Sequence, residues 1–282
     1  MRGKTLRYLA LKLLPKNLIS RLMGALADAP LPSPVLLSVI KLYAQIYQIR
    51  LDEVKKPLGE MKNFTQFFTR ELKEGSRPIP QDPKVVVSPV DGTIAQFGSI
   101  ENGLLVQAKG IYYSLADLVG PDLAKEFTEG YFVTIYLSPA DYHRIHTPVA
   151  GKVSRFSYFS GQLWPVNRFG VEKVGGLFAI NERLVTPIES QEAGLVGLVK
   201  VGATVVGKIK TTYTNLSSNQ GLSSALNLPV LPAKAYAKGA ELGHFQLGST
   251  VILLFQKGRF VPHEFIPGKK LQMGQLIGHT LP

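Results

Sequence analysis

The chain has 282 residues, of which 45% are hydrophobic and 18% are charged, and it contains no cysteine. This length and apolar fraction are enough for one large or two small domains with a buried core, and they argue against a disordered chain. Without cysteine there is no disulfide framework, no thiolate nucleophile and no cysteine-ligated metal. Oxygen and nitrogen groups must therefore carry any chemistry.

Positive charge is concentrated at the N-terminus. The formal net charge is +12, and residues 1–50 contain eight Lys or Arg residues but a single acid, Asp28. A basic excess of this kind can serve nucleic acid, an anionic membrane surface or an acidic substrate. The sequence around the charged residues is needed to distinguish between these partners.

The first fifty residues show helical periodicity. Apolar residues recur at three- and four-residue steps through residues 6–14, with basic residues between them, until Pro15 ends the pattern. A similar pattern covers residues 18–26. A third runs over residues 33–47, with Ser33 as the expected N-cap and a proline in the first turn. We therefore expect three amphipathic helices.

These helices suit an anionic lipid surface, because they carry basic residues at nearly every turn and almost no acids. Packing against the domain behind them is the alternative for any single apolar stripe. No uninterrupted apolar stretch reaches the ~18 residues that span a bilayer, and no secretory signal is recognisable. Residues 1–50 are therefore predicted to bind the cytoplasmic face of the cell membrane peripherally. Nucleic acid is not an expected partner, because no arrangement typical of its binding is present.

Residues 51–83 form a polar, proline-punctuated connection with a short helical pattern through three phenylalanines, Phe64, Phe67 and Phe68. From residue 84 to residue 282 the pattern changes to short β segments bounded by Gly, Pro, Asn or Asp. The expected strands are KVVVSP, GTIAQFG, GLLVQA, YFVTIYL, GKVSRFSYFS, LFAINERLVTPI, GLVGLVKV, ATVVGKIKTTY and STVILLF.

Two short helices are expected among these strands, one over residues 114–119 with Ser114 as N-cap and one over residues 123–127. The predicted fold class is α+β, with a strand-rich catalytic domain of β-sandwich-like or barrel-like type behind the N-terminal amphipathic helices. The sequence has no GxGxxG or P-loop motif, so nucleotide chemistry has no support, and it has no GxSxG motif of an α/β-hydrolase.

Four residues are candidates for catalysis. His143 and His146 lie three apart in YLSPADYHRIHTP, and histidine is the natural acid or base near neutral pH. Asp91 lies at an Asp-Gly turn in SPVDGTI, and Ser249 follows Gly248 directly before an apolar run. Structural roles are the alternative: a turn for Asp91, and capping or metal binding for the histidines. The metal alternative lacks a third ligand of matching spacing.

Taken together in the order Asp91, His146, Ser249, these residues resemble a known family. The chain is similar to the bacterial phosphatidylserine decarboxylases that carry an LGST motif. The matching stretches run in order from Phe64 to Phe255 and are FFTREL, SPVDG, KGIYYSLADLVG, YLSPADYHRIHTP, LFAINER, VGATVVGKI and GHFQLGST.

The resemblance implies a pyruvoyl-dependent carboxy-lyase that converts phosphatidylserine to phosphatidylethanolamine. Ser249 would attack the carbonyl of Gly248, and the chain would be cut between them, leaving a pyruvoyl group in place of Ser249 as the covalent cofactor. The products would be a β chain of residues 1–248 and an α chain of residues 249–282. The two would stay together as a heterodimer, because the strand after the cut would belong to the sheet.

The same resemblance implies roles for the other candidates. His146 would be the base that activates Ser249, and Asp91 would orient His146, the division of labour found in serine proteases. His143 would donate the proton that the substrate carbanion needs after carbon dioxide has left.

Two alternatives use the same sequence differently. A Ser-His-Asp hydrolase acting on lipid esters would employ the same three residues without self-cleavage. A basic peripheral membrane module would bind lipid head groups without chemistry, and Ser249 would then be dispensable. Gly-Ser-Thr directly before a strand favours backbone cleavage, since a hydrolase serine usually lies on an exposed turn.

Overall fold

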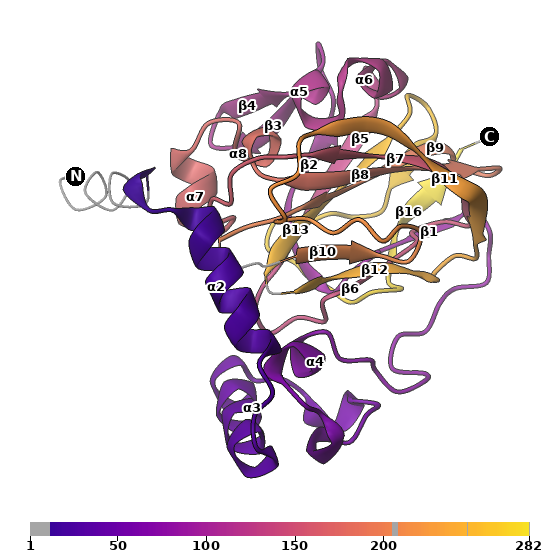
Figure 1. Ribbon diagram of the computed structural model, residues 1–282. Helices are drawn as coiled ribbons and strands as arrows, with labels where there is room; N and C mark the ends of the chain where they lie inside the picture. Colours follow the sequence, from indigo (N-terminus) through magenta and orange to yellow (C-terminus); the bar gives the residue numbers. More distant parts are fainter. Residues whose placement is uncertain (1–11, 205–207, 247, 282) are drawn as a thin grey trace.

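The computed structural model describes residues 12–204, 208–246 and 248–281, and an eight-stranded antiparallel sheet forms its centre (Figure 1). Across this sheet the strands are β11 (Ala225–Tyr236), β7 (Gly151–Phe159), β8 (Arg183–Ser190), β9 (Gly194–Val201), β13 (Ser249–Phe255), β5 (Tyr131–Leu137), β2 (Gly92–Ser99) and β15 (Lys270–Leu271). The sheet runs from edge strand β11 to edge strand β15 and does not close on itself. The predicted strand-rich α+β class is confirmed, with an open sheet in place of a barrel.

Strand β13 occupies the middle of the sheet because its sequence is apolar on both faces. All seven of its residues are buried, and it pairs with β5 on one side and β9 on the other. Two hydrophobic cores cover the two faces: Val251, Leu253 and Phe255 belong to one, and Ile252 and Leu254 to the other. A strand buried on both faces reads as a continuous apolar run, as STVILLF does.

Three smaller sheets surround the large one. The first contains β1 (Val85–Val87), β16 (Leu276–Thr280) and β14 (Phe260–Pro262), the second β10 (Lys208–Thr211), β12 (Glu241–Gln246) and β6 (Arg144–His146), and the third β3 (Leu104–Ala108) and β4 (Ile111–Ser114). Short helices fill the connections, namely α5 (Leu115–Val119), α6 (Pro121–Phe127), α7 (Arg168–Lys173) and α8 (Leu177–Ile180). As predicted, the Ser114 hydroxyl caps α5 by accepting a bond from the backbone N–H of Asp117 at 3.2 Å.

The N-terminal helices lie along one side of the sheet domain (Figure 1). Helix α2 (Lys16–Asp28) begins after Pro15, and α3 (Ser33–Tyr47) ends at Gln48 in the left-handed conformation. The following segment contains the short helices η1 (Leu51–Glu53), η2 (Leu58–Glu60) and α4 (Phe64–Phe68). It packs with α3 into a small core of Leu36, Ile40, Ala44, Val54, Met61 and Phe67. Among the described residues no helix is long and apolar enough to cross a membrane.

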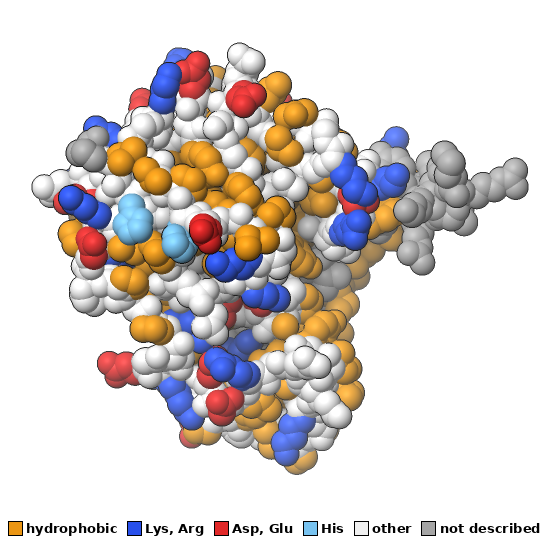
Figure 2. Space-filling view, turned by 180° about the vertical axis from the view of Figure 1, so that it is seen from behind, with side chains coloured by type: hydrophobic (Ala, Val, Ile, Leu, Met, Phe, Trp, Pro, Cys, Tyr) orange, Lys and Arg blue, Asp and Glu red, His pale blue; other side chains and the backbone are white. Residues whose placement is uncertain are grey.

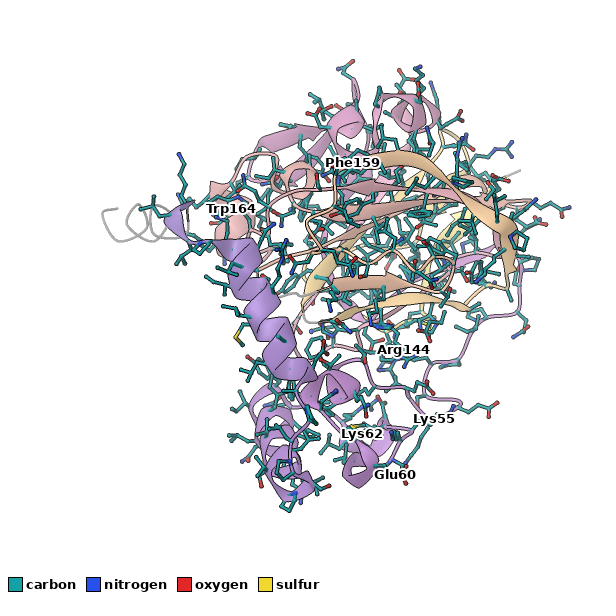
Figure 3. All side chains as sticks on the ribbon, in the orientation of Figure 1. Lys55, Glu60, Lys62, Arg144, Phe159 and Trp164 are labelled. Atoms are coloured by element: carbon teal, nitrogen blue, oxygen red, sulfur yellow. The ribbon has the colours of Figure 1, made fainter. Side chains whose placement is uncertain are left out.

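Helix α2 turns its polar side to the protein. The Asn17 side chain donates to the carbonyl of Gly161 at 3.0 Å, the Lys16 ammonium lies 4.0 Å from the centre of the Trp164 ring, and Arg21 bonds to Asn219 at 3.3 Å (Figure 3 labels Trp164). The opposite side of α2 is apolar and exposed, with Leu18, Leu22 and Leu26 among its residues. In Figure 2 hydrophobic side chains run down this side of the molecule, below the grey N-terminal residues.

Several sequence predictions need correction. Ser33 does not cap α3; Pro32 takes the cap position, and the Ser33 hydroxyl donates to the carbonyl of Gly59 at 3.2 Å. The segment LFAINERLVTPI is not one strand, since its first four residues form α8 and β8 starts only at Arg183. In ATVVGKIKTTY only β10 is a strand among the described residues. The first predicted helix falls largely on residues 1–11, outside the described residues.

Candidate active site at the start of the central strand

Ser249 is the first residue of β13, and its side chain is completely buried. Its Oγ atom has no hydrogen-bond partner among the described residues. Gly248, the residue before it, is half-buried and lines an apolar cavity. A buried hydroxyl without a partner costs about 1 to 3 kcal/mol in folding free energy.

His143 lies just before β6, with its imidazole buried against the ring of Phe68, 4.1 Å away between ring centres. Its Nδ1 is 2.7 Å from the carbonyl oxygen of Asp141. Because a carbonyl can only accept, Nδ1 carries the proton and Nε2 carries a lone pair. Nε2 is buried and has no partner among the described residues. Burial lowers the pKa of His143 to about 3, so this histidine is neutral at physiological pH.

His146 closes β6 and is held at both ring nitrogens. Nδ1 donates to the carbonyl of Gly239 at 2.8 Å, and the Tyr142 hydroxyl lies 3.2 Å from Nε2, which leaves Tyr142 as the donor. Burial lowers the pKa of His146, and the carboxylate of Asp91 is among the charges that act in the opposite direction. The neutral tautomer with a basic Nε2 is the form that the structure favours.

Asp91 forms a two-pronged ion pair with Arg77, with Nε to Oδ1 at 2.9 Å and an Nη to Oδ2 at 2.5 Å. The backbone N–H of Met273 donates to the same Oδ1 at 2.7 Å. Hydrogen bonds to both carboxylate oxygens fix the position of the group. Among the described contacts Asp91 makes no hydrogen bond to His146, so its influence on that histidine is electrostatic.

The four predicted residues thus come from three places in the sheet domain: the turn before β2, strand β6 with the residue before it, and the start of β13. The structure does not join them into one hydrogen-bonded chain, since no bond links Ser249 to either histidine among the described residues. The sequence analysis missed Tyr142, Arg77 and Phe68 as neighbours of the site. For two of them the sequence contained a signal, because Tyr142 lies within the motif YHRIH and Phe68 within the motif FFTREL.

Arg144, labelled in Figure 3, fastens this region to the connecting segment. Its guanidinium donates to the carbonyl of Thr69 at 3.0 Å, and it forms ion pairs with Glu241 at 2.6 Å and Glu71 at 3.3 Å. These contacts position the end of α4, and with it Phe68, against the segment that contains His143 and strand β6. Among the described residues no cluster of three or more His, Asp or Glu could hold a metal ion.

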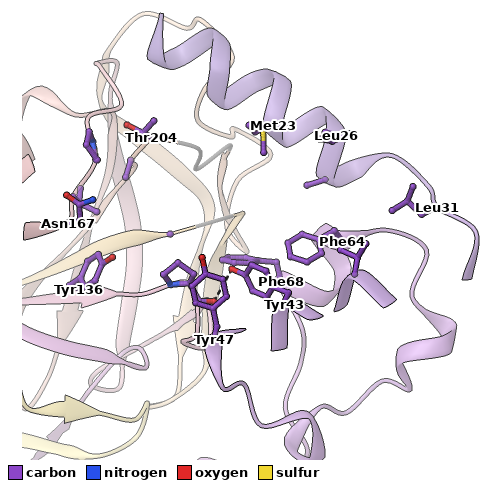
Figure 4. Close-up of a pocket in the computed structure, with 17 residues that line it drawn as sticks. Met23, Leu26, Leu31, Tyr43, Tyr47, Phe64, Phe68, Tyr136, Asn167 and Thr204 are labelled. Carbon is purple, nitrogen blue, oxygen red and sulfur yellow. Dashed lines mark hydrogen bonds between the residues drawn. The ribbon is translucent and has the colours of Figure 1, made fainter. Parts of the chain in front are cut away.

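An apolar cavity of about 590 Å³ lies between the N-terminal helices and the sheet domain. Figure 4 shows its helical side, with Met23, Leu26, Leu31, Tyr43, Tyr47, Phe64 and Phe68, and its sheet side, with Tyr136, Asn167 and Thr204. Gly248 is part of the sheet side, and Phe68 separates the cavity from His143. The cavity therefore connects the exposed apolar helices with the backbone at the start of β13.

A sequence model of the family described as phosphatidylserine decarboxylase matches residues 64–279. The chain belongs to the phosphatidylserine decarboxylase family. Among its relatives, the phosphatidylserine decarboxylase proenzyme of Brevibacillus brevis is 42% identical over 98% of both chains. The proenzymes of an Anaeromyxobacter species and of Myxococcus xanthus are 45% and 42% identical, each over 95% of this chain and 96% of the relative.

Membership of this family confirms the main prediction from the sequence, a decarboxylase acting on phosphatidylserine. Because the relatives are named as proenzymes, it also favours this prediction over a hydrolase that remains uncut. The reading as a membrane module without chemistry is set aside by the same finding.

Proposed function

We propose that the enzyme cuts its own chain between Gly248 and Ser249 and converts Ser249 into a pyruvoyl group. The Ser249 Oγ adds to the carbonyl carbon of Gly248 and the peptide C–N bond breaks, giving an ester and a free amine. Elimination then releases Gly248 as a carboxylate and leaves dehydroalanine at position 249. Water hydrolyses this group to pyruvoyl and ammonia, so that atoms balance without an external oxidant.

The single observation that carries this proposal is the buried Oγ of Ser249, which has no hydrogen-bond partner among the described residues and lies at the start of the central strand, next to a glycine. Gly248 has no side chain to obstruct the approach of Oγ to its carbonyl. A pyruvoyl group at this position supplies the electrophilic carbonyl that accepts electrons when the substrate carboxylate leaves. No standard side chain provides such a sink.

The residue roles that we propose are those that the family resemblance implies. His146 is the base for chain cleavage: its Nε2 lone pair becomes available when the long, 3.2 Å contact with Tyr142 breaks. Asp91 favours proton uptake by His146 through its charge, from a position fixed by Arg77. We assign the proton of the later step to His143, as the resemblance implies. Its Nε2 has no partner among the described residues, and because burial lowers the pKa of His143, this nitrogen must take up a proton before it can give one.

The substrate reaches this site from a membrane. The leucines on the outer side of α2 are 53%, 62% and 67% exposed at Leu18, Leu22 and Leu26, and Leu42 and Ile46 on α3 are similarly exposed. Exposed apolar rows of this size mark lipid or partner contacts. The basic N-terminal segment supports attachment to the anionic cytoplasmic face. Acyl chains that enter the cavity beneath α2 and α3 would bring the head group to Gly248 and Ser249.

The two chains produced by the cut stay together as a heterodimer. Strand β13, the first element of the new α chain, pairs along its length with β5 and β9 of the β chain. Separation would expose seven buried residues and break both ladders of backbone hydrogen bonds.

Intact-mass analysis under denaturing conditions tests this proposal. The wild-type enzyme should give two chains cut between Gly248 and Ser249, with the smaller one blocked at its N-terminus and reactive with hydroxylamine. Ser249→Ala should give one uncut, inactive chain, and the exposed Ser160→Ala should be cut normally. A single intact wild-type chain that is active on phosphatidylserine and indifferent to hydroxylamine would refute the proposal.

A further inference from the structure

A second cavity, of about 310 Å³, shares Tyr47 with the apolar cavity and is lined in large part by charged residues. Its wall contains four basic residues and three carboxylates. The ion pairs among them are Arg50 with Glu53, Arg77 with Glu53 and Asp91, and Lys270 with Asp141. Each carboxylate of the wall therefore has a basic partner. Arg70 forms no ion pair among the described residues, although the charge of Asp91 acts on it.

Arg70 is buried, with 5% of its surface exposed. Its Nη2 makes only long hydrogen bonds, 3.3 Å to the carbonyl of Ala140 and 3.4 Å to that of Asp141. Nε and Nη1 are buried without a partner among the described residues. Buried guanidinium N–H groups normally have hydrogen-bond acceptors, so we infer that a ligand supplies the acceptor for these two. The contacts of Nη2 are long, and binding of an anion in the cavity requires the guanidinium to rotate so that Nε or Nη1 faces it.

Arg70 is also a direct neighbour of the catalytic region. Its Nη2 and the Nδ1 of His143 bond to the same carbonyl oxygen, that of Asp141. The guanidinium lies over the ring of Phe67, 5.3 Å from its centre, and the next residue, Phe68, packs on His143. An anion bound by Arg70 would therefore lie within a head group's length of the residue that handles the substrate proton.

We propose that Arg70 binds the phosphodiester of the lipid head group while the serine part of that head group reacts at position 249. This inference rests on the proposed function, because it takes phosphatidylserine as the substrate of that site. One unpaired guanidinium matches the single negative charge of a phosphodiester, and its planar fork of donors fits two phosphate oxygens.

The reaction itself decides between the two anionic groups of the substrate. The carboxylate loses its charge as carbon dioxide leaves, so a guanidinium bound to it would stabilise the starting state more than the transition state and slow the step. The phosphodiester keeps its charge throughout. Binding it contributes equally to substrate and transition state, which lowers KM without changing kcat.

Kinetics on detergent-dispersed phosphatidylserine give the first test, with the processed enzyme. In Arg70→Gln, KM should rise about tenfold to a hundredfold, the loss expected for charge-assisted hydrogen bonds, while kcat stays within about twofold. Arg70→Lys keeps the charge but not the fork and should lie between. The control is Arg155→Gln, which removes an exposed arginine from β7 and should match the wild type. A fall in kcat at unchanged KM would overturn the proposal.

Binding of soluble head groups gives the second test and does not depend on the pyruvoyl group. Full-length Ser249→Ala protein is titrated with glycerophosphoethanolamine, serine and inorganic phosphate by ligand-observed NMR. We expect glycerophosphoethanolamine to bind and serine, which has the carboxylate but no phosphate, to bind at least tenfold more weakly. Tighter binding of serine would assign Arg70 to the carboxylate, and tighter binding of inorganic phosphate would assign it to a free anion; either result overturns the proposal.

The two tests also separate this inference from the proposed function. If wild-type protein is not cut or does not decarboxylate, the proposed function fails while the titration of Ser249→Ala still reports on the anion site. If the enzyme is cut and active but glycerophosphoethanolamine does not bind, the Arg70 proposal fails and the proposed function stands.

Discussion

A buried lysine in the middle of the sheet should make the fold less stable at neutral pH than a methionine would. Lys200 lies on β9, opposite Val251 of the central strand, and is completely buried. Its Nζ donates to the hydroxyl of Thr186 at 2.5 Å, and that oxygen lies 2.5 Å from the hydroxyl of Tyr213. An ammonium group has three N–H donors, and the described contacts satisfy one of them. Burial lowers the pKa of Lys200 from 10.5 to about 7.

The magnitude follows from this difference in pKa. At pH 7 the unfolded chain holds a proton on Lys200 that the folded chain holds only half the time, and each step of one in pKa is worth about 1.4 kcal/mol. The cost of burying Lys200 at pH 7, where the folded group is half protonated, is therefore about 4 kcal/mol. Lys200→Met loses one hydrogen bond, worth about 1 kcal/mol, and leaves Thr186 and Tyr213 bonded to each other. Allowing for imperfect packing of methionine, we expect a gain in unfolding free energy of about 2 to 4 kcal/mol.

The pH dependence provides the sharper measurement. Between pH 7 and pH 10 the unfolded state binds more protons than the folded state, so wild-type stability should rise with pH by up to about 1.4 kcal/mol per pH unit from this residue. The variant should lack that rise, and its advantage should shrink towards pH 10. Urea unfolding of Ser249→Ala, a single uncut chain, avoids the complication of two fragments. The exposed Lys152→Met on β7 is the control and should change stability little at any pH.

Two outcomes would refute this reasoning. Lys200→Met could be less stable than the parent at pH 7, which would mean that the amine is well solvated or well paired in the folded chain. Alternatively, the two proteins could differ by a constant amount across the pH range, which would mean that Lys200 does not titrate differently in the folded and unfolded states.

Two further predictions concern catalysis and membrane binding. His146→Ala should leave the chain uncut. His143→Ala should still be cut but should lose at least about a hundredfold in decarboxylation rate, because its proposed role follows chain cleavage. Mass analysis measures the cut and a carbon dioxide assay measures the decarboxylation, and a fully cut His146→Ala protein would contradict the assignment of the base. Replacing Leu18 and Leu22 by serine should reduce partitioning into anionic vesicles at least about tenfold, since burying a leucine in an apolar phase is worth about 1.5 to 3 kcal/mol. The double variant should keep its activity on detergent-dispersed substrate. The control Ile266→Ser, which replaces another exposed apolar residue, should partition like the wild type. Unaltered partitioning of the double variant would show that α2 does not contact the membrane.

Local features of the fold could be read from the sequence. The run STVILLF predicts a strand buried on both faces, and β13 is that strand. Ser114 predicts the start of α5, because its cap requires only neighbours in the chain. Strand β11 was missed, since Pro229 and Pro232 argue against a strand. It lies at the edge of the sheet, where a missing N–H costs no ladder bond, and edge position is not a local property.

The residue types of the site were also readable, but their contacts were not. The sequence named Asp91, His143, His146 and Ser249 as a group. Only the folded chain decides that Asp91 bonds to Arg77 and that the Nδ1 of His146 bonds to the carbonyl of Gly239. Such contacts join segments that are distant along the chain and have no periodic signature, so a single sequence does not encode them in a recognisable pattern.

The orientation of α2 also depends on the tertiary structure, although the helix itself can be predicted from the sequence. The four-residue spacing of Leu18, Leu22 and Leu26 determines that an amphipathic helix forms, because side chains at this spacing share one face. Which face meets the protein depends on what the sheet domain offers. Here it offers Trp164, Asn219 and the carbonyl of Gly161 to the polar face, and the leucines are left outside. A helix pattern fixes two faces, and only the surface against which it packs decides which of them is buried.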